Sequence, residues 1–330
     1  MKILIIRFSS IGDIVLTTPV ARCLKLQIPN AEIHFCTKRM YQSLIETNPY
    51  IDYCHCLDDS LPNLIRRLYR EQYDCVIDLH NNLRTKLIKL TLRTYSYTIN
   101  KRNIRKWLYI RLKLNSMPDE HIVDRYMATL KPLKINNDGL GLDYFIPDSA
   151  RVTKDQLPFT HQQAYIAYAI GGQHATKRLP LARIIELCRQ LNQPIILLGS
   201  PEDREVGEAV QQELGDQLIF NACGLYSLNQ SASLLQQARI VFSHDTGLMH
   251  IAAALKKPIY SIWGNTTPQL GMYPYKTPHI IVENKNLGCR PCSKIGYQSC
   301  PRQHFRCMSD LPFNFVLPSI NTQPTNVHYQ

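Results

Sequence analysis

The sequence has no long apolar run. None of its apolar stretches reaches the roughly 18 residues that a membrane-spanning helix needs. The apolar stretch before Arg7 is too short for the core of a signal peptide, and no small-residue cleavage site follows it. These absences predict a cytoplasmic protein that is neither exported nor embedded in a membrane.

Acidic side chains are outnumbered by basic ones. The 330 residues include 26 Asp and Glu against 38 Lys and Arg, a formal net charge of +12. This excess predicts an anionic partner: nucleic acid, a membrane surface or a phosphorylated substrate. Glycine and proline, at 14 and 20 residues, are too few for a collagen-like or low-complexity chain. The 11 cysteines are an odd number in a chain without an export signal, which favours reduced thiols.

Apolar strand patterns alternate with helical patterns in both halves of the chain. In the first half we expect strands at 2–8, 32–37, 75–79 and 95–99, and helices at 14–26, 61–70 and 83–92. In the second half we expect strands at 165–170, 194–199, 217–221, 239–245 and 258–264, and helices at 180–191, 201–214, 228–237 and 248–255. Short apolar strands between helices indicate parallel sheets covered on both faces. Residues 136–163 lack a clear period, so we predict two doubly wound α/β domains, 1–150 and 151–330, facing each other across a ligand-binding cleft.

Two nucleotide-binding fingerprints are missing. The sequence contains neither the G-x-G-x-x-G of dinucleotide-binding folds nor the Gly-Lys-Ser/Thr of a P-loop, and the first absence disfavours a nicotinamide dehydrogenase. Instead, the first strand runs into Ser9-Ser10-Ile11-Gly12-Asp13, a strand–loop–helix turn whose backbone N–H groups favour an anion. Asp13 is either a helix-capping carboxylate or a general base at the mouth of the cleft.

A second turn of this kind ends the expected strand 239–245. It reads Asp245-Thr246-Gly247-Leu248-Met249-His250, and the first-turn N–H groups of the helix behind it are able to hold a diphosphate. His250 is either a packing residue or a contact to the ligand.

Charged residues also follow two other strands of the second half. Lys177 and Arg178 precede a helix, where they either clamp phosphate oxygens or form a solvated basic loop. Glu202 lies in the turn after Gly199, where complementation of the helix dipole explains it and binding of ribose hydroxyls is the alternative.

One segment concentrates the basic charge. Residues 84–113 hold ten Lys and Arg and no acidic residue, interleaved with Tyr and Trp. Within it, Ile104, Trp107, Leu108 and Leu112 are able to share one helical face. A basic, aromatic, amphipathic segment suits an anionic membrane surface, and it also suits nucleic acid. A solvated helix face is the third interpretation.

Four cysteines lie close together late in the chain. Cys289-x2-Cys292-x7-Cys300-x6-Cys307 resembles the spacing of a structural zinc site, with His304 as an alternative fourth ligand. The second pair lacks the usual short gap, so reduced cysteines without a metal remain the alternative.

Four blocks of the sequence resemble the lipopolysaccharide heptosyltransferases of glycosyltransferase family 9, over residues 1 to about 308. The blocks are Ser9–Asp13 with Thr17-Thr18-Pro19, Gln173–Pro180, Asp245–His250 with Ala252-Ala253, and Ile262-Trp263-Gly264-Asn265-Thr266. The resemblance implies a GT-B fold of two Rossmann-like domains, with the acceptor on the N-terminal domain and the sugar nucleotide on the C-terminal one. It implies inverting transfer of heptose from ADP-heptose to the lipid A-linked inner core, without a metal in catalysis.

The resemblance also implies roles for individual residues. Asp13 is expected to be the general base and Lys177 to stabilise the leaving diphosphate. The residues expected to bind the donor are Thr176, Arg178, Gly199, Glu202, Asp245, Thr246, Gly247, Leu248 and His250. Those expected on the acceptor side are Ser10 and Gly12 in the first turn and Arg84, Lys86, Lys101 and Arg105 in the basic segment. This segment is expected to hold the phosphorylated acceptor at the inner face of the cytoplasmic membrane.

The sequence leaves two alternatives open and departs from the family once. A transferase using another nucleotide sugar has the same features, and so does a non-catalytic protein that binds sugar nucleotides or lipid A. Nucleic acid is not expected as a partner, since no nucleic-acid motif appears. Pro312, Pro318 and Pro324 disfavour the long closing helix that usually ends a GT-B chain.

Overall fold

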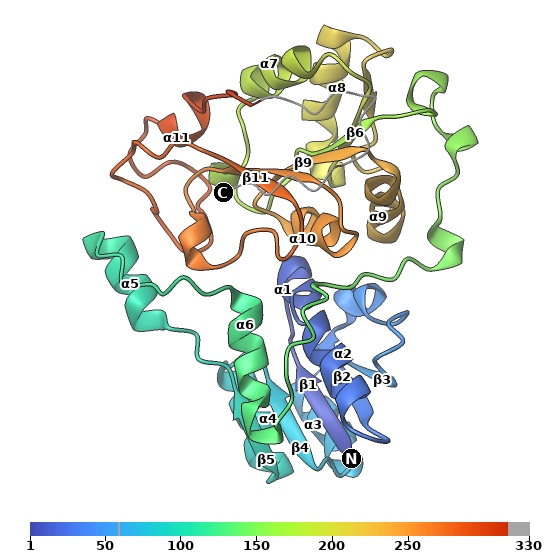
Figure 1. The fold of residues 1–330 in the computed structure, drawn as a ribbon, viewed down its shortest axis with the longest axis vertical. Coiled ribbons are helices and arrows are strands. Elements are labelled where there is room, and N and C mark those ends of the chain that lie inside the picture. Colours follow the sequence, from blue (N-terminus) through green and yellow to red (C-terminus); the bar gives the residue numbers. More distant parts are fainter. Residues whose placement is uncertain (59, 316–330) are drawn as a thin grey trace.

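The computed structural model describes residues 1–58 and 60–315, which form two parallel sheets lying one above the other (Figure 1). The N-terminal sheet has the strand order β3-β2-β1-β4-β5, and the C-terminal sheet has the order β11-β10-β9-β6-β7-β8. Every pairing between neighbouring strands is parallel. The doubly wound class predicted from the alternating pattern is confirmed.

The described residues of the N-terminal half form five strands, four of which lie where the sequence predicts them. They are β1 (Lys2–Ile6), β2 (Glu32–Lys38), β3 (Tyr53–Leu57), β4 (Cys75–Asp78) and β5 (Tyr95–Thr98). The helices are α1 (Ile11–Val15), α2 (Thr18–Gln27), α3 (Leu61–Arg70), α4 (Leu83–Leu92), α5 (Asn103–Leu112) and α6 (Ile122–Met127). The central strands β1 and β4 are buried almost completely, because helices cover both faces of the sheet.

The predicted helix 14–26 is two helices in the structure. Pro19, the second residue of α2, has no N–H group with which to continue α1. The hydroxyl of Thr17 donates a hydrogen bond to the carbonyl oxygen of Ile14 at 2.7 Å. At the break it therefore competes with the backbone N–H groups that would bond to this carbonyl in a continuous helix.

In the C-terminal half the predicted strands and helices are all present. The strands are β6 (Ile166–Ala169), β7 (Ile195–Leu198), β8 (Ile219–Asn221), β9 (Ile240–His244), β10 (Ile259–Trp263) and β11 (His279–Glu283). The helices are α7 (Leu181–Leu191), α8 (Arg204–Leu214), α9 (Leu228–Gln237), α10 (Gly247–Ala254) and α11 (Arg306–Ser309). No helix in 1–58 or 60–315 is long and apolar enough to cross a bilayer.

Two of the four edge strands, β3 and β11, were not expected from the sequence. An edge strand pairs on one side only, so it needs no continuous apolar run. β3 reads Tyr-Cys-His-Cys-Leu, and most residues of β11 are only partly buried.

Helices α1 and α10 join the two halves. They pack closely, and one apolar core runs from Ile3 and Ile5 of β1 through them to Val241 of β9. Two glycines make this approach possible. A Cβ atom added to Gly12 of α1 would lie 2.4 Å from the His250 ring, and one added to Gly247 of α10 would lie 2.6 Å from the Ile11 side chain. These two helices carry the two turns singled out in the sequence.

The segment between the domains contains short 3-10 turns only, at 148–150, 154–156 and 159–161. The division at residues 150 and 151 stays a prediction. The expectation that no long helix closes the chain falls on residues 309–330, of which 316–330 lie outside the described part.

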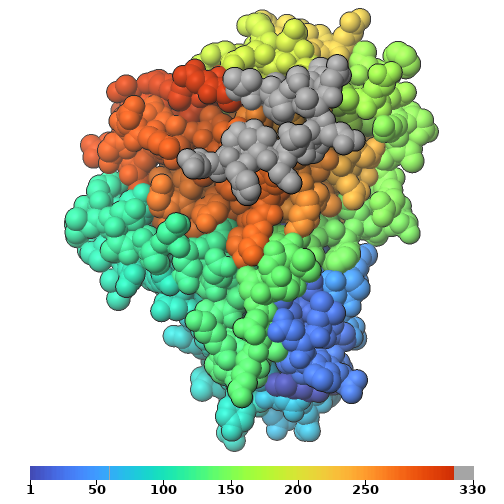
Figure 2. Space-filling view, in the orientation of Figure 1, coloured from blue at the N-terminus to red at the C-terminus, as the bar shows by residue number. Residues whose placement is uncertain are grey.

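Helix α5 protrudes from the N-terminal half toward the other domain (Figures 1 and 2). None of its residues is buried, and Ile104, Trp107 and Leu112 are all more than half exposed. Its C-terminal end contacts the cysteine block, because the ammonium of Lys113 donates to the carbonyl oxygens of Cys289 at 2.9 Å and of Pro291 at 2.7 Å.

Candidate active site

A cavity of about 870 Å³ lies between the two domains, at the carboxyl ends of both sheets. Its walls come from the turns after β1, β6, β7 and β9 and from the segment that contains α5. This is the position where ligands bind in doubly wound sheets.

Thirteen of the residues selected from the sequence line this cavity. They are Ser10, Gly12, Asp13, Lys101, Lys177, Arg178, Gly199, Glu202, Asp245, Thr246, Gly247, Leu248 and His250. They come from both domains, so the structure brings the N-terminal and C-terminal motifs to one place.

Four selected residues do not line the cavity. Thr176 is buried behind it, where its hydroxyl donates to the carbonyl oxygen of Tyr297 at 3.0 Å. Arg84 lines a separate hollow beside β3 and α3. Lys86 is exposed on α4, and Arg105 is exposed on α5 and donates to the carbonyl oxygen of Ser116.

Asp13 is the third residue of α1, and Ser10 precedes that helix as its N-cap. The Asp13 carboxylate accepts hydrogen bonds from the amide and hydroxyl of Ser10, at 3.2 and 3.0 Å. Its other oxygen lies 2.7 Å from a guanidinium nitrogen of Arg7. Burial raises the pKa of Asp13, but Arg7 and Ser10 outweigh it and hold the pKa below its usual range. Asp13 is therefore an ionised carboxylate at the cavity wall, with its Arg7 partner fixed by hydrogen bonds to Ser9 and Leu79.

Lys177 and Asp245 form an ion pair in the opposite wall. The Lys177 ammonium lies 2.6 Å from a carboxylate oxygen of Asp245 and 3.1 Å from the Asp245 carbonyl oxygen. The same carboxylate oxygen accepts from the Thr266 hydroxyl at 2.8 Å. The pair lies immediately before α10, so Lys177 is positioned beside that helix N-terminus.

The N-terminus of α10 opens into the cavity. Thr246 is its N-cap, and the Thr246 side chain makes no capping hydrogen bond to the first turn. The first-turn N–H groups are thus available to an anion. His250, one turn further on, is buried, and its Nδ1 has no hydrogen-bond partner among the residues that the structure describes. Burial lowers the pKa of His250 to about 4, so its imidazole is neutral at pH 7.

Asp203, which sequence reasoning passed over in favour of Glu202, organises the turn after β7. It is buried, accepts from the Ser200 amide and hydroxyl at 2.8 Å each, and lies 3.2 Å from a guanidinium nitrogen of Arg178. A Cβ atom on Gly199 would lie 2.8 Å from the Asp203 side chain, which explains the glycine there.

Lysines of the N-terminal half, and one of the cysteine block, add positive charge to the cavity. Lys101, Lys106 and Lys294 line it, and none of their ammonium groups forms a hydrogen bond or ion pair within the described ranges. Burial lowers the pKa of Lys106 to about 8, with Arg125 as a second cause. Sequence reasoning selected Lys101 but missed Lys106 and Lys294, although Lys106 lies in the basic segment.

The four cysteines of the late block lie near one another but do not form a closed ligand set. Cys289, Cys292 and Cys300 are partly buried and Cys307 is buried. The Cys289 sulfur lies 3.8 Å from Nε2 of His304. Within 1–58 and 60–315, these residues do not bring three ligand atoms within 4.8 Å of one another. A zinc site here stays a prediction.

Two parallel-sheet α/β domains that face each other across a cleft are the fold of GT-B glycosyltransferases. The solved structures agree: a family 9 glycosyltransferase from Veillonella parvula has a TM-score of 0.71 at 22% identity, covering 86% of both chains. The ADP-heptose heptosyltransferase II of Escherichia coli has a TM-score of 0.67 at 20% identity, covering 94% of this chain and 98% of that one.

The sequence comparisons define the family. The model of glycosyltransferase family 9 (heptosyltransferase) matches residues 62–300. Lipooligosaccharide heptosyltransferase 2 of Haemophilus influenzae is 27% identical over 293 residues, which cover 82% of this chain and 85% of that protein. Lipopolysaccharide heptosyltransferase 2 of E. coli is 23% identical over 298 residues, which cover 81% and 84%. The chain belongs to glycosyltransferase family 9, the heptosyltransferases.

Proposed function

We propose that this protein transfers heptose from ADP-heptose to the lipid A-linked inner core of lipopolysaccharide, with inversion at the anomeric carbon. Its relatives are named as lipopolysaccharide or lipooligosaccharide heptosyltransferases, and one E. coli heptosyltransferase of the same fold is a complex with ADP-2-deoxy-2-fluoro heptose. The observation that carries the proposal is that an ionised carboxylate, Asp13, and an uncapped helix N-terminus, that of α10, face one cavity from opposite domains.

The donor diphosphate binds the C-terminal wall. Its oxygens accept hydrogen bonds from the first-turn N–H groups of α10 and from Lys177 and Arg178. Lys177 then shares its ammonium between Asp245 and the departing ADP, whose negative charge grows as the sugar bond breaks. Since protein cations and N–H groups supply this charge compensation, the proposed transfer needs no metal ion. The adenosine lies toward Gly199 and Glu202, whose carboxylate suits ribose hydroxyls.

Asp13 acts as the general base. As the acceptor hydroxyl oxygen bonds to the anomeric carbon, the hydroxyl proton passes to the Asp13 carboxylate and ADP leaves from the opposite face. A single displacement of this kind inverts the anomeric configuration. Arg7 keeps Asp13 ionised and holds its direction, so it is a positioning residue.

The acceptor lies on the N-terminal side, beside Lys101, Lys106 and Lys294. Their unpaired charges suit the phosphate and carboxylate groups of an acidic glycolipid. Helix α5 lies at the edge of this region with exposed Ile104 and Trp107 and with basic residues around them. We therefore infer a peripheral position on the inner face of the cytoplasmic membrane, with α5 contacting anionic lipids.

Two assays test the function. The first is calorimetric titration of the metal-free protein with ADP, ADP-heptose and UDP. Selective binding of ADP and ADP-heptose is expected, whereas preference for UDP would point to a different sugar donor. The second is transfer of heptose to lipopolysaccharide that lacks heptose, with and without EDTA. Donor binding without any transfer would favour a non-catalytic binding protein, and loss of transfer in EDTA would contradict the metal-free mechanism.

A further inference from the structure

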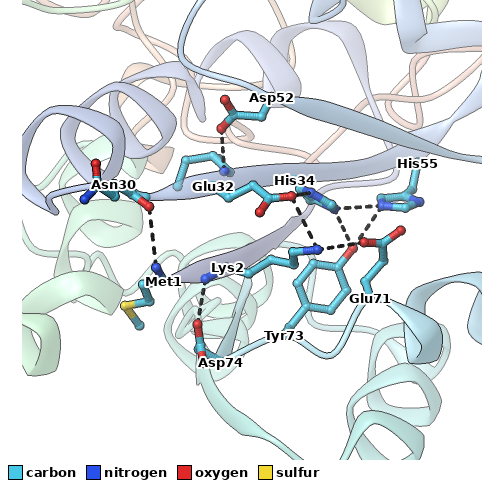
Figure 3. A network of polar contacts seen from close by, with 12 residues as sticks. Met1, Lys2, Asn30, Glu32, His34, Asp52, His55, Glu71, Tyr73 and Asp74 are labelled. Atoms are coloured by element: carbon cyan, nitrogen blue, oxygen red, sulfur yellow. Dashed lines mark hydrogen bonds and ion pairs between the residues drawn. The ribbon is translucent and has the colours of Figure 1, made fainter.

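A cluster of buried polar side chains lies in the N-terminal sheet, outside the cavity described above (Figure 3). His34 lies near the amino end of β2, His55 lies on β3, and Glu71 and Tyr73 lie between α3 and β4. His34, His55 and Tyr73 are all at least 93% buried. The cleft is at the carboxyl ends of these strands, so neither donor nor acceptor as proposed above reaches this cluster.

Three polar atoms of the cluster form a closed triangle. Nδ1 of His34 lies 3.0 Å from Nε2 of His55, and the Tyr73 hydroxyl oxygen lies 2.9 Å from each of these nitrogens. Nε2 of His34 lies 2.8 Å from a carboxylate oxygen of Glu32. A His34 tautomer that donates from Nε2 to Glu32 presents a lone pair on Nδ1 to the triangle.

The triangle has too few protons for its three edges. Tyr73 supplies one hydroxyl proton, and a neutral His55 supplies one at most. Two protons therefore leave at least one of the three edges without a hydrogen bond of its own, which is unfavourable in a buried site. A cation among the lone pairs removes this conflict.

Glu71 adds a carboxylate to the two imidazoles. Ligand atoms of His34, His55 and Glu71 all lie within 4.8 Å of one another, the one such group in the described ranges. The Lys2 ammonium lies 2.9 Å from a carboxylate oxygen of Glu71 and 3.3 Å from one of Glu32. With neutral histidines, these two carboxylates and one ammonium give the cluster a net charge of −1. This charge favours a cation over an anion.

We propose that His34, His55 and Glu71 form a zinc site, with the Tyr73 hydroxyl or a water molecule as the fourth ligand. Two imidazoles and a carboxylate are a typical zinc ligand set, and tetrahedral zinc with bonds of about 2.0–2.1 Å separates its ligand atoms by about 3.3 Å. The two imidazole nitrogens, at 3.0 Å, already meet this spacing within a few tenths of an ångström. Glu32 acts as the positioning residue that fixes the tautomer of His34.

Zinc binding by the full-length protein tests the site directly. The protein is stripped of metal with a chelator and dialysed against Zn²⁺, and bound zinc is counted for the wild type and for the variants His55→Gln, Glu71→Gln and Glu32→Gln. Because the cysteine block is a second candidate, the double variant Cys289→Ser, Cys292→Ser is the matched control. Co²⁺ in place of Zn²⁺ distinguishes the two, since only thiolate ligands give a sulfur-to-cobalt absorption band.

The expected result is one zinc equivalent that is lost in His55→Gln and Glu71→Gln and retained in the cysteine variant. Glu32→Gln should keep the site with about 10–100-fold weaker affinity, as for other groups that orient a metal-bound histidine. Glu71 is at the surface, so its variant is expected to fold, which thermal unfolding without metal verifies. Zinc binding that Glu71→Gln and His55→Gln leave unchanged, or no binding beyond that of the cysteine pair, overturns the proposal. Neither result bears on heptose transfer.

Discussion

Replacement of Gly12 or Gly247 by alanine should push the two domains apart. The new Cβ atom at position 12 would lie 2.4 Å from Cδ2 of His250, and that at position 247 would lie 2.6 Å from Cγ2 of Ile11. Nonbonded carbon atoms pack at about 3.5–4.0 Å, so each contact must open by about 1 Å. Both neighbours belong to the packed interface of α1 and α10, so neither side chain can move aside without moving its helix.

The magnitude follows from two opposing effects. Forcing a methyl group into a packed contact costs typically about 1–3 kcal/mol. Gly12 lies inside α1, where the higher helix propensity of alanine stabilises the folded state by up to about 1 kcal/mol. Taking the full gain from the cost, we expect the free energy of unfolding to fall by about 0–2 kcal/mol for Gly12→Ala, and by slightly more for Gly247→Ala at the helix start. The effect on turnover should be larger, because a shift of about 1 Å between Asp13 and the donor costs on the order of 100-fold in rate.

The assay compares thermal unfolding and heptose transfer for both variants with those of Gly288→Ala. No atom of the described residues lies within 4 Å of a Cβ added to Gly288, and its φ is not positive, so its replacement should change neither quantity. ADP affinity should fall less than turnover in Gly12→Ala, since the donor binds the other domain. Turnover in Gly12→Ala within threefold of that in Gly288→Ala would refute the idea that this contact sets the cleft geometry.

Three further predictions concern the cleft and α5. Asp13→Asn should lower the turnover number by about 10²–10⁴-fold, while the ADP affinity measured by calorimetry stays within threefold of the wild-type value. Comparable losses of turnover and ADP affinity would contradict a base role. Because the pKa of Lys106 is about 8, Lys106 loses its charge as the pH increases through 8, and the KM for the anionic acceptor should rise. Lys106→Arg stays charged and should abolish that rise. An unchanged pH profile in Lys106→Arg would exclude Lys106 from acceptor binding. Trp107→Ala should weaken sedimentation with vesicles that contain anionic lipid, whereas Leu90→Ala, on the exposed face of α4, should not; equal binding by both variants would place the membrane contact elsewhere.

The sequence allowed the central strands to be predicted but not every side chain that reaches the cavity. Strands such as β1 and β9 are buried on both faces, so their composition alone marks them. Which of two adjacent residues faces the cavity depends on how their helix or turn is oriented relative to the cleft. The structure buries Asp203 and leaves Glu202 exposed, and it directs Lys106 rather than Arg105 to the cavity. Local sequence does not contain this orientation, because packing of the whole domain determines it.

The pairing of charges in the cavity separates the donor side from the acceptor side. Each aspartate that lines the cavity has a cation: Arg7 for Asp13, Lys177 for Asp245 and Arg178 for Asp203. A diphosphate that binds Lys177 must therefore compete with a carboxylate already 2.6 Å away, so much of the gain in donor binding has to come from the N–H groups of α10.

The lysines on the other side carry no such partners within 1–58 and 60–315. An anion that reaches Lys101, Lys106 and Lys294 displaces no carboxylate, and it also relieves the mutual repulsion that lowers the pKa of Lys106 along with burial. The acceptor side is thus the part of the cavity where an anionic ligand gains most from charge alone. We therefore expect added salt to weaken acceptor binding more than donor binding. Salt screens unpaired, partly exposed charges more strongly than it screens hydrogen bonds to a helix N-terminus.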